Sequence, residues 1–477
     1  MSVIVHGGTI DSKKIVAVST PKDRQALEAL ARYIPPGLVK QVLQRTGRGS
    51  SRQRRLPAPS VVWLVIAIGL WGDRDIPALW RQVAGTLQNL LQAAGFGKPP
   101  PGKSALSKAR SRLGARPLRQ LFLAVSRPLA RRTTRGAFYR GLRLMIIDGQ
   151  KLLLPDTPAN RKAFGKHTTR RSGRVVPAGY PQVHLMRLLE AGTHLTVELL
   201  VKPCKKHEYP LAGALMQKAR PLLDLILWDR GFYGYSLLRQ AIDTDRYVLG
   251  RVSSTVVFEA VQTLPDGSFL ARIYPSWQAR RRRQDGRIVR VISYSFKDPN
   301  RPGHGQRHRL VTTLLDAQEY PARDLVVLYH QRWEIEIDND EITTHQLNRP
   351  VELRSGTPVN IVQEIYGIFL AHNAIRALMH EAALRVDMDP RTLSFIHAVR
   401  VIKDAIPLLR AAPHNQLPRL YRGLLIQISR GILPPRDGRI NPRVVKIKMS
   451  NYKKKRPEHL APPQPSVAFQ EDIVILK

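Results

Sequence analysis

Three acidic residues stand where carboxylates could hold metal ions. Asp148 and Asp229 each end an apolar run that reads as a strand, LRLMIID and LDLILWD. A carboxylate in such a place is costly unless it is solvated, paired or bound to a cation, and strand ends are where α/β sheets bind ligands. Together with Glu336 they could hold two Mg²⁺ ions, which activate water or a 3′-hydroxyl for in-line displacement at a phosphodiester.

Glu336 shares a predicted helix with two further candidates. Tyr329, Arg332 and Glu336 are spaced i, i+3, i+7 and therefore fall on one helix face. A tyrosine hydroxyl and a guanidinium can hold a phosphate beside a metal-binding carboxylate. A surface helix with an ordinary Arg–Glu pair is the plain alternative. Asp340, one turn further on, is a reserve ligand, and Asp156 is a second reserve that a turn or cap would also explain.

The surrounding pattern predicts the elements that position these groups. Asp148-Gly149 reads as a turn between two strands, and the apolar run before Asp229 reads as a buried strand. Short alternating runs over 247–320 predict an all-β module. The remaining expected elements are a hairpin at 180–201, a helix at 211–223, and long helices at 323–347, 358–385, 390–411 and 415–430.

Composition indicates an anionic partner. The 477 residues include 77 Lys and Arg against 36 Asp and Glu, a formal charge of +41. Such an excess favours nucleic acid. Residues 22–125 read as helices, and the span from Ile76 to Ile147 contains fourteen basic and no acidic residues. Within it, a helix beginning near Ser104 carries three basic residues as candidate DNA contacts: Lys108, Arg110 and Arg112.

Three other signals are weaker. GKPPPGKS at 97–104 matches a phosphate-binding loop, but prolines fill three of its four variable positions and have no N–H to donate, so no nucleotide site is expected. Cys204 is the single cysteine, which argues against disulfides and zinc. The apolar stretch at 61–71 is too short to cross a bilayer and predicts a buried helix, and no signal peptide is evident.

Several motifs together resemble a known family. IIDGQKLLLPDTPANRKAFG, LWDRGFYG, YHQRWEIE, RPVELRSGTPVNIVQEIYG and NPRVVKIKMSNY are similar to segments of the insertion-sequence-four family of bacterial DDE transposases. The resemblance covers nearly the whole chain. It implies a ribonuclease-H-like core with a β insertion, a catalytic triad of Asp148, Asp229 and Glu336 binding Mg²⁺ or Mn²⁺, and Tyr329 and Arg332 as a DNA-contacting pair.

The expected organisation follows from pattern and resemblance together. It comprises a helical N-terminal DNA-binding domain (1–125), a mixed-sheet core with C-terminal helices (126–253 with 322–432), an all-β insertion (254–321) and a basic tail (433–477). The implied activity is metal-dependent cleavage at inverted-repeat ends and strand transfer into target DNA, by a dimer in the bacterial cytoplasm at the nucleoid. An end-binding relic that represses transposition and a simple nuclease are the alternatives.

Two positions bear on that activity. The family signature ends in a lysine seven residues after its glutamate, where this chain has Thr343. The loss should weaken the hold on DNA rather than metal binding. In the β module, Trp277 stands beside Arg280–Arg283, so Trp277 and Arg281 could stack on an extruded base. A core tryptophan near a basic turn is the plain alternative.

Overall fold

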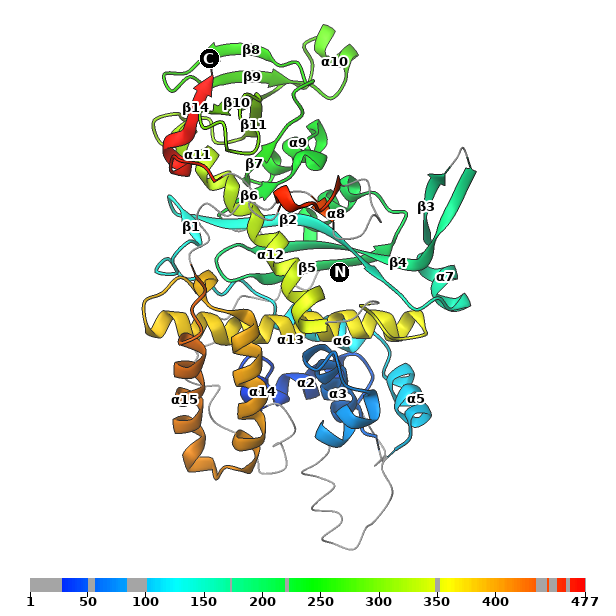
Figure 1. Ribbon diagram of the computed structural model, residues 1–477. Helices are drawn as coiled ribbons and strands as arrows, with labels where there is room; N and C mark the ends of the chain where they lie inside the picture. The colour runs from blue at the N-terminus through cyan, green and yellow to red at the C-terminus, as the bar shows by residue number, and fades with distance from the viewer. Residues whose placement is uncertain are drawn as a thin grey trace, which may run out of the picture.

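The computed structural model describes residues 28–49, 56–83, 101–171, 174–218, 223–347, 352–434, 444–445, 453–459 and 464–476. One mixed sheet runs through most of it, in the order β3-β4-β2-β6-β7-β11-β10-β9-β8, with β5 beside β4, β14 beside β10 and β1 beside β2 (Figure 1). The site lies where parallel strands β2, β6 and β7 adjoin antiparallel β4: Leu142–Leu153, Asp224–Trp228, Tyr247–Arg251 and Arg174–Glu190.

The predicted turn at Asp148-Gly149 is wrong. β2 continues through both residues, and its ladder with β4 pairs Asp148 with Arg187 and Gly149 with Met186. The parallel ladder with β6 ends earlier, at the pair Ile146 and Leu227. A long antiparallel partner thus keeps the dipeptide extended, and Asp148 stands just beyond the point where the parallel neighbour stops.

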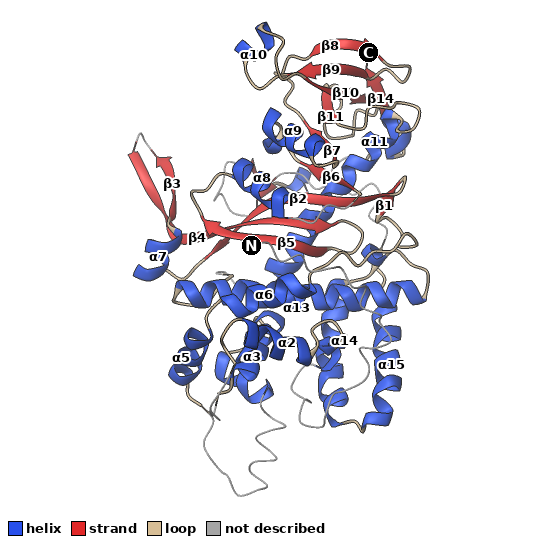
Figure 2. Ribbon diagram, turned by 180° about the vertical axis from the view of Figure 1, so that it is seen from behind, coloured by secondary structure: helices blue, strands red, loops and turns tan. Residues whose placement is uncertain are grey.

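Helices cover both faces of the central sheet. α8 and α9 (Glu208–Lys218 and Tyr235–Asp243) lie on the face seen in Figure 2, where Trp228, Leu215 and Leu238 are buried. α11 and α12 (Ala322–Tyr329 and Glu334–Asp340) cross the other face, joined by the 3-10 turn η3 and followed by the π-helical η4: His330–Trp333 and Glu341–Leu347. The expected helix at 323–347 is therefore built of four short helical pieces.

A helical layer lies beneath β4 and β5 (Leu195–Pro203). The N-terminal helices α1, α2, α3, α5 and α6 pack around the long helix α13: Glu28–Ala31, Pro36–Arg45, Ala58–Leu70, Lys103–Leu113, Arg116–Val125 and Pro358–Arg385. α3 is buried along most of its length, as the apolar stretch predicts, and none of the described helices is long and apolar enough to cross a membrane.

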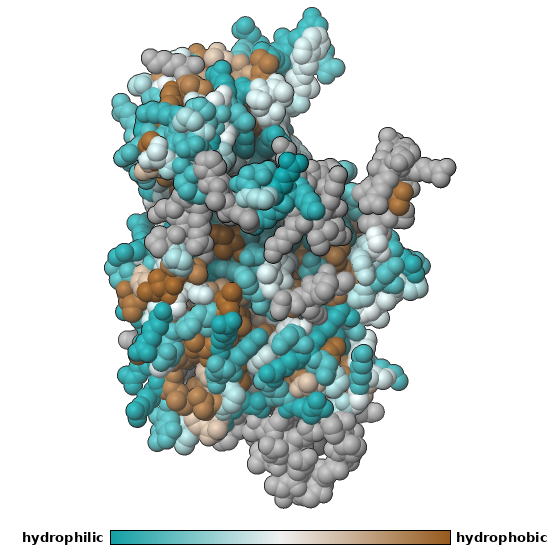
Figure 3. Space-filling model, in the orientation of Figure 1, coloured by the Kyte–Doolittle hydropathy of each residue, from teal (hydrophilic) through white to brown (hydrophobic). Residues whose placement is uncertain are grey.

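The two helices that follow α13 form a hairpin below it. α14 and α15 span Phe395–Ala411 and Leu417–Ser429 and pack on each other and on α13. Hydrophobic side chains gather at the surface over this hairpin, at the lower left of Figure 3, and include Leu408 and Ile426. The first helix, expected over 390–411, begins at Phe395 after the 3-10 turn Pro390–Thr392, and the second lies within the expected 415–430.

The strands after β7 extend the same sheet. β11 pairs with β7, followed by β10, β9 and β8: His308–Thr312, Arg287–Phe296, Phe269–Ile273 and Glu259–Thr263. The expectation of an all-β module is incomplete, because a short helix α10, Trp277–Arg281, connects β9 to β10. The other short elements are β1 Phe138–Tyr139, α7 Pro158–Phe164, β3 Lys166–Arg171, β12 Val444–Val445, β13 Lys453–Lys454, and the 3-10 turns η2 Arg230–Phe232, η5 Pro390–Thr392, η6 His414–Gln416 and η7 Pro457–His459.

The segment 464–476 docks on this sheet, although residues 433–477 were expected to form a basic tail. α16 and β14 span Phe469–Asp472 and Ile473–Leu476, and β14 pairs with β10. The buried Asp472 carboxylate accepts backbone hydrogen bonds from Lys297 and Asp298 at 2.8 and 2.7 Å. The segment 464–476 is therefore part of the folded sheet and not a tail.

Candidate active site

The two aspartates come together through strand register. Ile146 on β2 lies opposite Leu227 on β6, so the residues two further along are Asp148 and Asp229. Side chains two apart on a strand point to the same face. Asp229 directly follows β6 and caps η2, with its Oδ1 accepting from the backbone N–H of Arg230 at 2.7 Å. The sheet thus presents both carboxylates at the carboxyl end of β6.

Arg332 pairs with Glu336 and is close enough to both aspartates for their charges to act on it. Its Nη2 lies 3.2 Å from the Glu336 Oε1, and its side chain is almost fully buried. Burial by itself lowers the pKa of this guanidinium, but Tyr329, Asp229, Glu336 and Asp148 act in the opposite direction and the net pKa is raised. All three candidate carboxylates therefore share the field of one buried cation.

The charge of the Asp148 carboxylate is only partly compensated by its neighbours. Burial raises its pKa to about 6, although the Gly149 N–H, Arg332 and Arg187 all favour the charged form. The Gly149 N–H donates to its Oδ1 at 2.8 Å. A carboxylate in this condition gains from a bound cation. The donor set is all oxygen, which suits Mg²⁺ or Mn²⁺.

Tyr329 lies inside the site rather than on an open surface. Its side chain is 7% exposed, and burial raises the pKa of its hydroxyl. The Asp229 carboxylate acts in the same direction and Arg332 opposes it. Tyr329 and Arg332 are thus buried beside the acidic residues, and Glu336, with 43% of its side chain exposed, is the open member of this helix face.

Comparison with known proteins identifies the family. A model of the insertion element 4 transposase N-terminal region matches residues 24–123, and a model of the transposase DDE domain matches residues 139–374. The chain is 30% identical over 435 residues to transposase InsG for insertion sequence element IS4 of Escherichia coli strain K12, covering 90% of this chain and 94% of that protein. The chain belongs to the IS4 family of DDE transposases.

A more distant likeness is to the piggyBac transposase synaptic complex with hairpin DNA, with a TM-score of 0.40 and 13% identity over 87% of each chain. Family membership makes this protein a DNA transposase, an enzyme that acts on DNA, and its DDE domain implies a divalent cation. Nothing in the described part of the chain favours the end-binding relic.

The basic helix α5 of this transposase divides its three candidate residues between two faces. Lys108 and Arg112, one turn apart, are exposed. Arg110 is 2% exposed, and its Nη2 donates to the Ser355 Oγ and the Asn360 carbonyl, each at 3.0 Å. The expectation that Arg110 contacts DNA is therefore wrong, because its guanidinium joins α5 to α13. The helix also begins at Lys103, after Gly102, without a Ser104 cap.

Trp277 stands at the surface. Its side chain is 67% exposed at the start of α10, and the Arg281 guanidinium lies over its ring, 4.8 Å from the centroid. The core-tryptophan alternative is excluded by this exposure. A flat aromatic face next to a cation is the type of surface on which a nucleobase can stack.

The remaining candidates are occupied locally. Asp156 accepts from Lys166 Nζ at 2.9 Å and lies 3.5 Å from Arg161 Nε, so it has protein partners away from the acidic set. Asp340 pairs with His345 at 3.3 Å. The Thr343 hydroxyl donates to the Asn339 carbonyl of its own helix at 2.9 Å and offers no cation to DNA.

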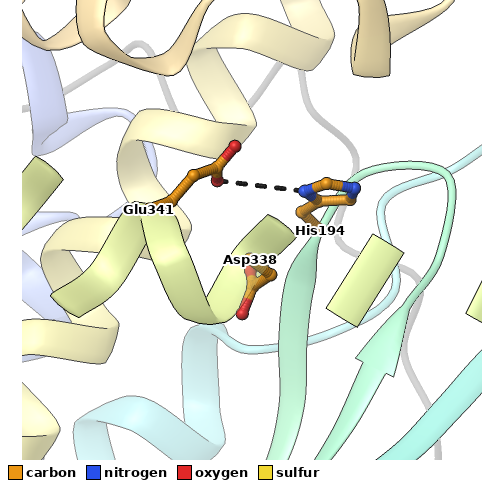
Figure 4. Close-up of side chains that lie close together, drawn as sticks. All are labelled: His194, Asp338 and Glu341. Carbon is orange, nitrogen blue, oxygen red and sulfur yellow. Dashed lines mark ion pairs between the residues drawn. The ribbon is translucent and has the colours of Figure 1, made fainter. Parts of the chain in front are cut away.

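A buried ionic network behind α12 escaped the sequence analysis. His194, Asp338 and Glu341 bring ligand-type atoms within 4.8 Å of one another (Figure 4). Burial would raise the pKa of Glu341, but Arg376, His194 and His372 hold it well below its usual range. Arg376 Nε donates to Glu341 at 2.9 Å, so a protein cation already neutralises this cluster. Its members come from distant segments, and no sequence spacing reveals it.

A basic pocket of about 400 Å³ lies near the junction of the helical layer and the core. It is lined by residues of α6, β5, α8 and α13, including four cationic side chains: Arg116, Arg119, Lys202 and Lys218. Its described lining contains no acidic residue. Four cations around one hollow favour an anionic occupant.

Proposed function

We propose that Asp148, Asp229 and Glu336 form the catalytic acidic set of this transposase. They would carry metal-dependent phosphodiester cleavage at the inverted-repeat ends of the element and strand transfer into target DNA. The observation that carries the proposal is Arg332, a buried guanidinium that lies 3.2 Å from Glu336 and whose charge also acts on Asp148 and Asp229. Strand register supports it, because Asp148 and Asp229 stand two residues beyond a directly opposed pair.

The chain's residues would divide the chemistry between them. A divalent cation held by the three carboxylates, Mg²⁺ or in its place Mn²⁺, would lower the pKa of a bound water or 3′-hydroxyl and neutralise the leaving oxygen. Arg332 would exchange part of its contact with Glu336 for a DNA phosphate oxygen, a charge-assisted donor role that guanidinium serves well. Tyr329, with its hydroxyl kept protonated by burial, would donate to the same strand.

DNA would extend from the acidic set over the basic surfaces. Lys108 and Arg112 would contact phosphates from α5, and the pocket near α6 would accept a phosphate of the backbone. Trp277 and Arg281 would stack on a base displaced from the duplex during end processing. The exposure of Lys108, Arg112, Trp277 and Arg281, against the burial of Arg110, supports this division.

We further propose a ribonuclease-H-like core of residues 126–253 and 322–432, with 1–125 as the DNA-binding domain, 254–321 as a β insertion and 433–477 as a C-terminal segment. The parallel β2-β6-β7 arrangement with antiparallel β4 and β5 supports this core. Two transposon ends must be held together, so the active form would be a dimer on DNA, acting in the bacterial cytoplasm at the nucleoid.

The test is a cleavage assay on the terminal DNA of the encoding element. D148N, D229N and E336Q should each abolish Mg²⁺-dependent cleavage while leaving end binding intact, because each substitution removes one ligand charge and keeps the side-chain shape. D340N is the matched control, since Asp340 is exposed on the same helix and pairs with His345; it should stay active. Full cleavage by any of the three variants would refute this acidic set.

A further inference from the structure

A buried arginine links strand β4 to the helix that carries Glu336. In the β2–β4 ladder, Arg187 is the direct cross-strand partner of Asp148. Directly opposed residues of an antiparallel pair point to the same face of the sheet. From that face, the Arg187 guanidinium reaches α12, where Nη1 donates to the Asp338 carboxylate and Nη2 to the Asn339 side-chain oxygen. These two acceptors follow Glu336 by two and three residues.

The contact is shielded from solvent. The side chains of Arg187 and Asp338 are 1% and 0% exposed. The Arg187 guanidinium also lies over the Phe369 ring of α13, 5.3 Å from its centroid, and Nη1 stands 3.4 Å from the Thr196 hydroxyl. A planar guanidinium with two acceptors fixes direction as well as distance, which an ammonium group cannot do.

We propose that Arg187 is a positioning residue that fixes Glu336 relative to Asp148. The Arg187 backbone is fixed by the strand register opposite Asp148. Its guanidinium holds the side chains of Asp338 and Asn339, just past Glu336 on the same helical segment. The inference rests on the proposed function, because it assumes that these two carboxylates act together. Mg²⁺ tolerates little deviation from octahedral geometry, so loss of the tether should raise the Mg²⁺ concentration that cleavage requires.

The same segment has further attachments that do not use Arg187, although they belong to the same buried network as Asp338. His194 Nε2 lies 2.7 Å from the Glu334 carboxylate, and Arg376 Nε donates to Glu341 at 2.9 Å. These contacts hold the two ends of the segment 334–341, whereas Arg187 holds its middle at Asp338 and Asn339. A variant of Arg187 should therefore keep α12 in place and change the setting of Glu336.

The decisive variant is R187K, which keeps the positive charge and removes the two-pronged donor. Removing a group that orients a metal ligand typically reduces metal affinity or activity by about 10–100-fold. We therefore expect end binding to change by less than about twofold, cleavage of bound ends to slow by at least about tenfold, and the half-saturating Mg²⁺ concentration to rise. D338N, which removes the partner's charge, should shift the Mg²⁺ requirement in the same direction, and it serves as the test if R187K does not fold.

The matched control is R290K. Arg290 is likewise a fully buried strand arginine paired with a carboxylate, Asp266, but it sits on β10 outside the acidic set. R290K should lower thermal stability without changing the Mg²⁺ requirement. If R187K behaves like R290K, the positioning role is refuted and the ion pair is merely structural. E336Q in the same assay separates the two proposals, because activity of E336Q would overturn the acidic set itself and the tether with it.

Discussion

The close crossing of α3 and α13 depends on two glycines, and substituting one of them tests how tightly these two helices pack. A methyl group at Gly367 would lie 2.4 Å from the Val65 carbonyl oxygen and 2.7 Å from the Val65 Cγ1. One at Gly69 would lie 2.6 Å from the Gly367 carbonyl oxygen. Because the obstacles are mainly backbone atoms of buried helices, G367A must push α3 and α13 apart.

The magnitude follows from two opposed effects. Overpacking a core usually costs about 1–3 kcal/mol, whereas replacing glycine by alanine inside a helix contributes about 1 kcal/mol of stabilisation. A contact against a rigid carbonyl falls at the upper end of the first range, which leaves a net loss of about 1–2 kcal/mol of unfolding free energy. Urea unfolding of the full chain, followed by circular dichroism, measures it as a lower midpoint.

G423A is the control, since Gly423 lies inside α15 and nothing stands within 4 Å of an added methyl. This variant should gain up to about 1 kcal/mol. An equal or higher urea midpoint for G367A than for the unaltered protein would refute the close crossing. End binding should weaken along with G367A stability, because α3 belongs to the N-terminal helical region.

Three further outcomes are expected. E341Q should lower the unfolding free energy at pH 7 by about 3–5 kcal/mol, because it leaves the buried Arg376 without its carboxylate. Since the folded pKa of Glu341 is depressed, this stabilisation is present above the unfolded pKa and is lost as the pH falls through the folded pKa. A difference between the urea midpoints of E341Q and the unaltered protein that persisted in acid would contradict it. K108A should reduce the slope of log affinity for DNA against log salt by about 1, measured by filter binding. R110A should lower stability and leave that slope unchanged. The opposite pattern would mean that the face of α5 that carries Arg110, and not the face that carries Lys108, contacts DNA. T343K should tighten end binding and steepen the same slope by about 1, and unaltered binding would mean that no phosphate passes this position.

Local sequence patterns predicted most of the secondary structure and the order of the elements. The apolar runs before Asp148 and Asp229 are strands, and the i, i+3, i+7 spacing does bring Arg332 to Glu336. The Asp-Gly turn signal failed because pairing with β4 across the sheet overrides a local preference. Arg110 could have been placed correctly, since it shares a helix face with Leu106 and Leu113, which are both buried.

Long-range contacts escaped the sequence for a physical reason. Arg187 meets Asp338 across 151 positions, and Arg376 meets Glu341 across 35. No periodicity connects such residues, because only the folded sheet and helices bring them together. The strand Ile473–Leu476 did leave a signal, four apolar residues in a row, but the basic composition of the preceding segment concealed it.

That strand makes the fold divisible. Ile473–Leu476 completes the sheet by pairing with residues 293–296 of β10, and Asp472 anchors it to the backbone at 297–298. These contacts are noncovalent, and they come from a short segment that is distant in sequence from β10. A polypeptide broken between Pro434 and Gln464 would keep every other strand of this sheet on one fragment. The peptide from 464 onward could then be supplied as a separate molecule, and its binding would restore the intact sheet.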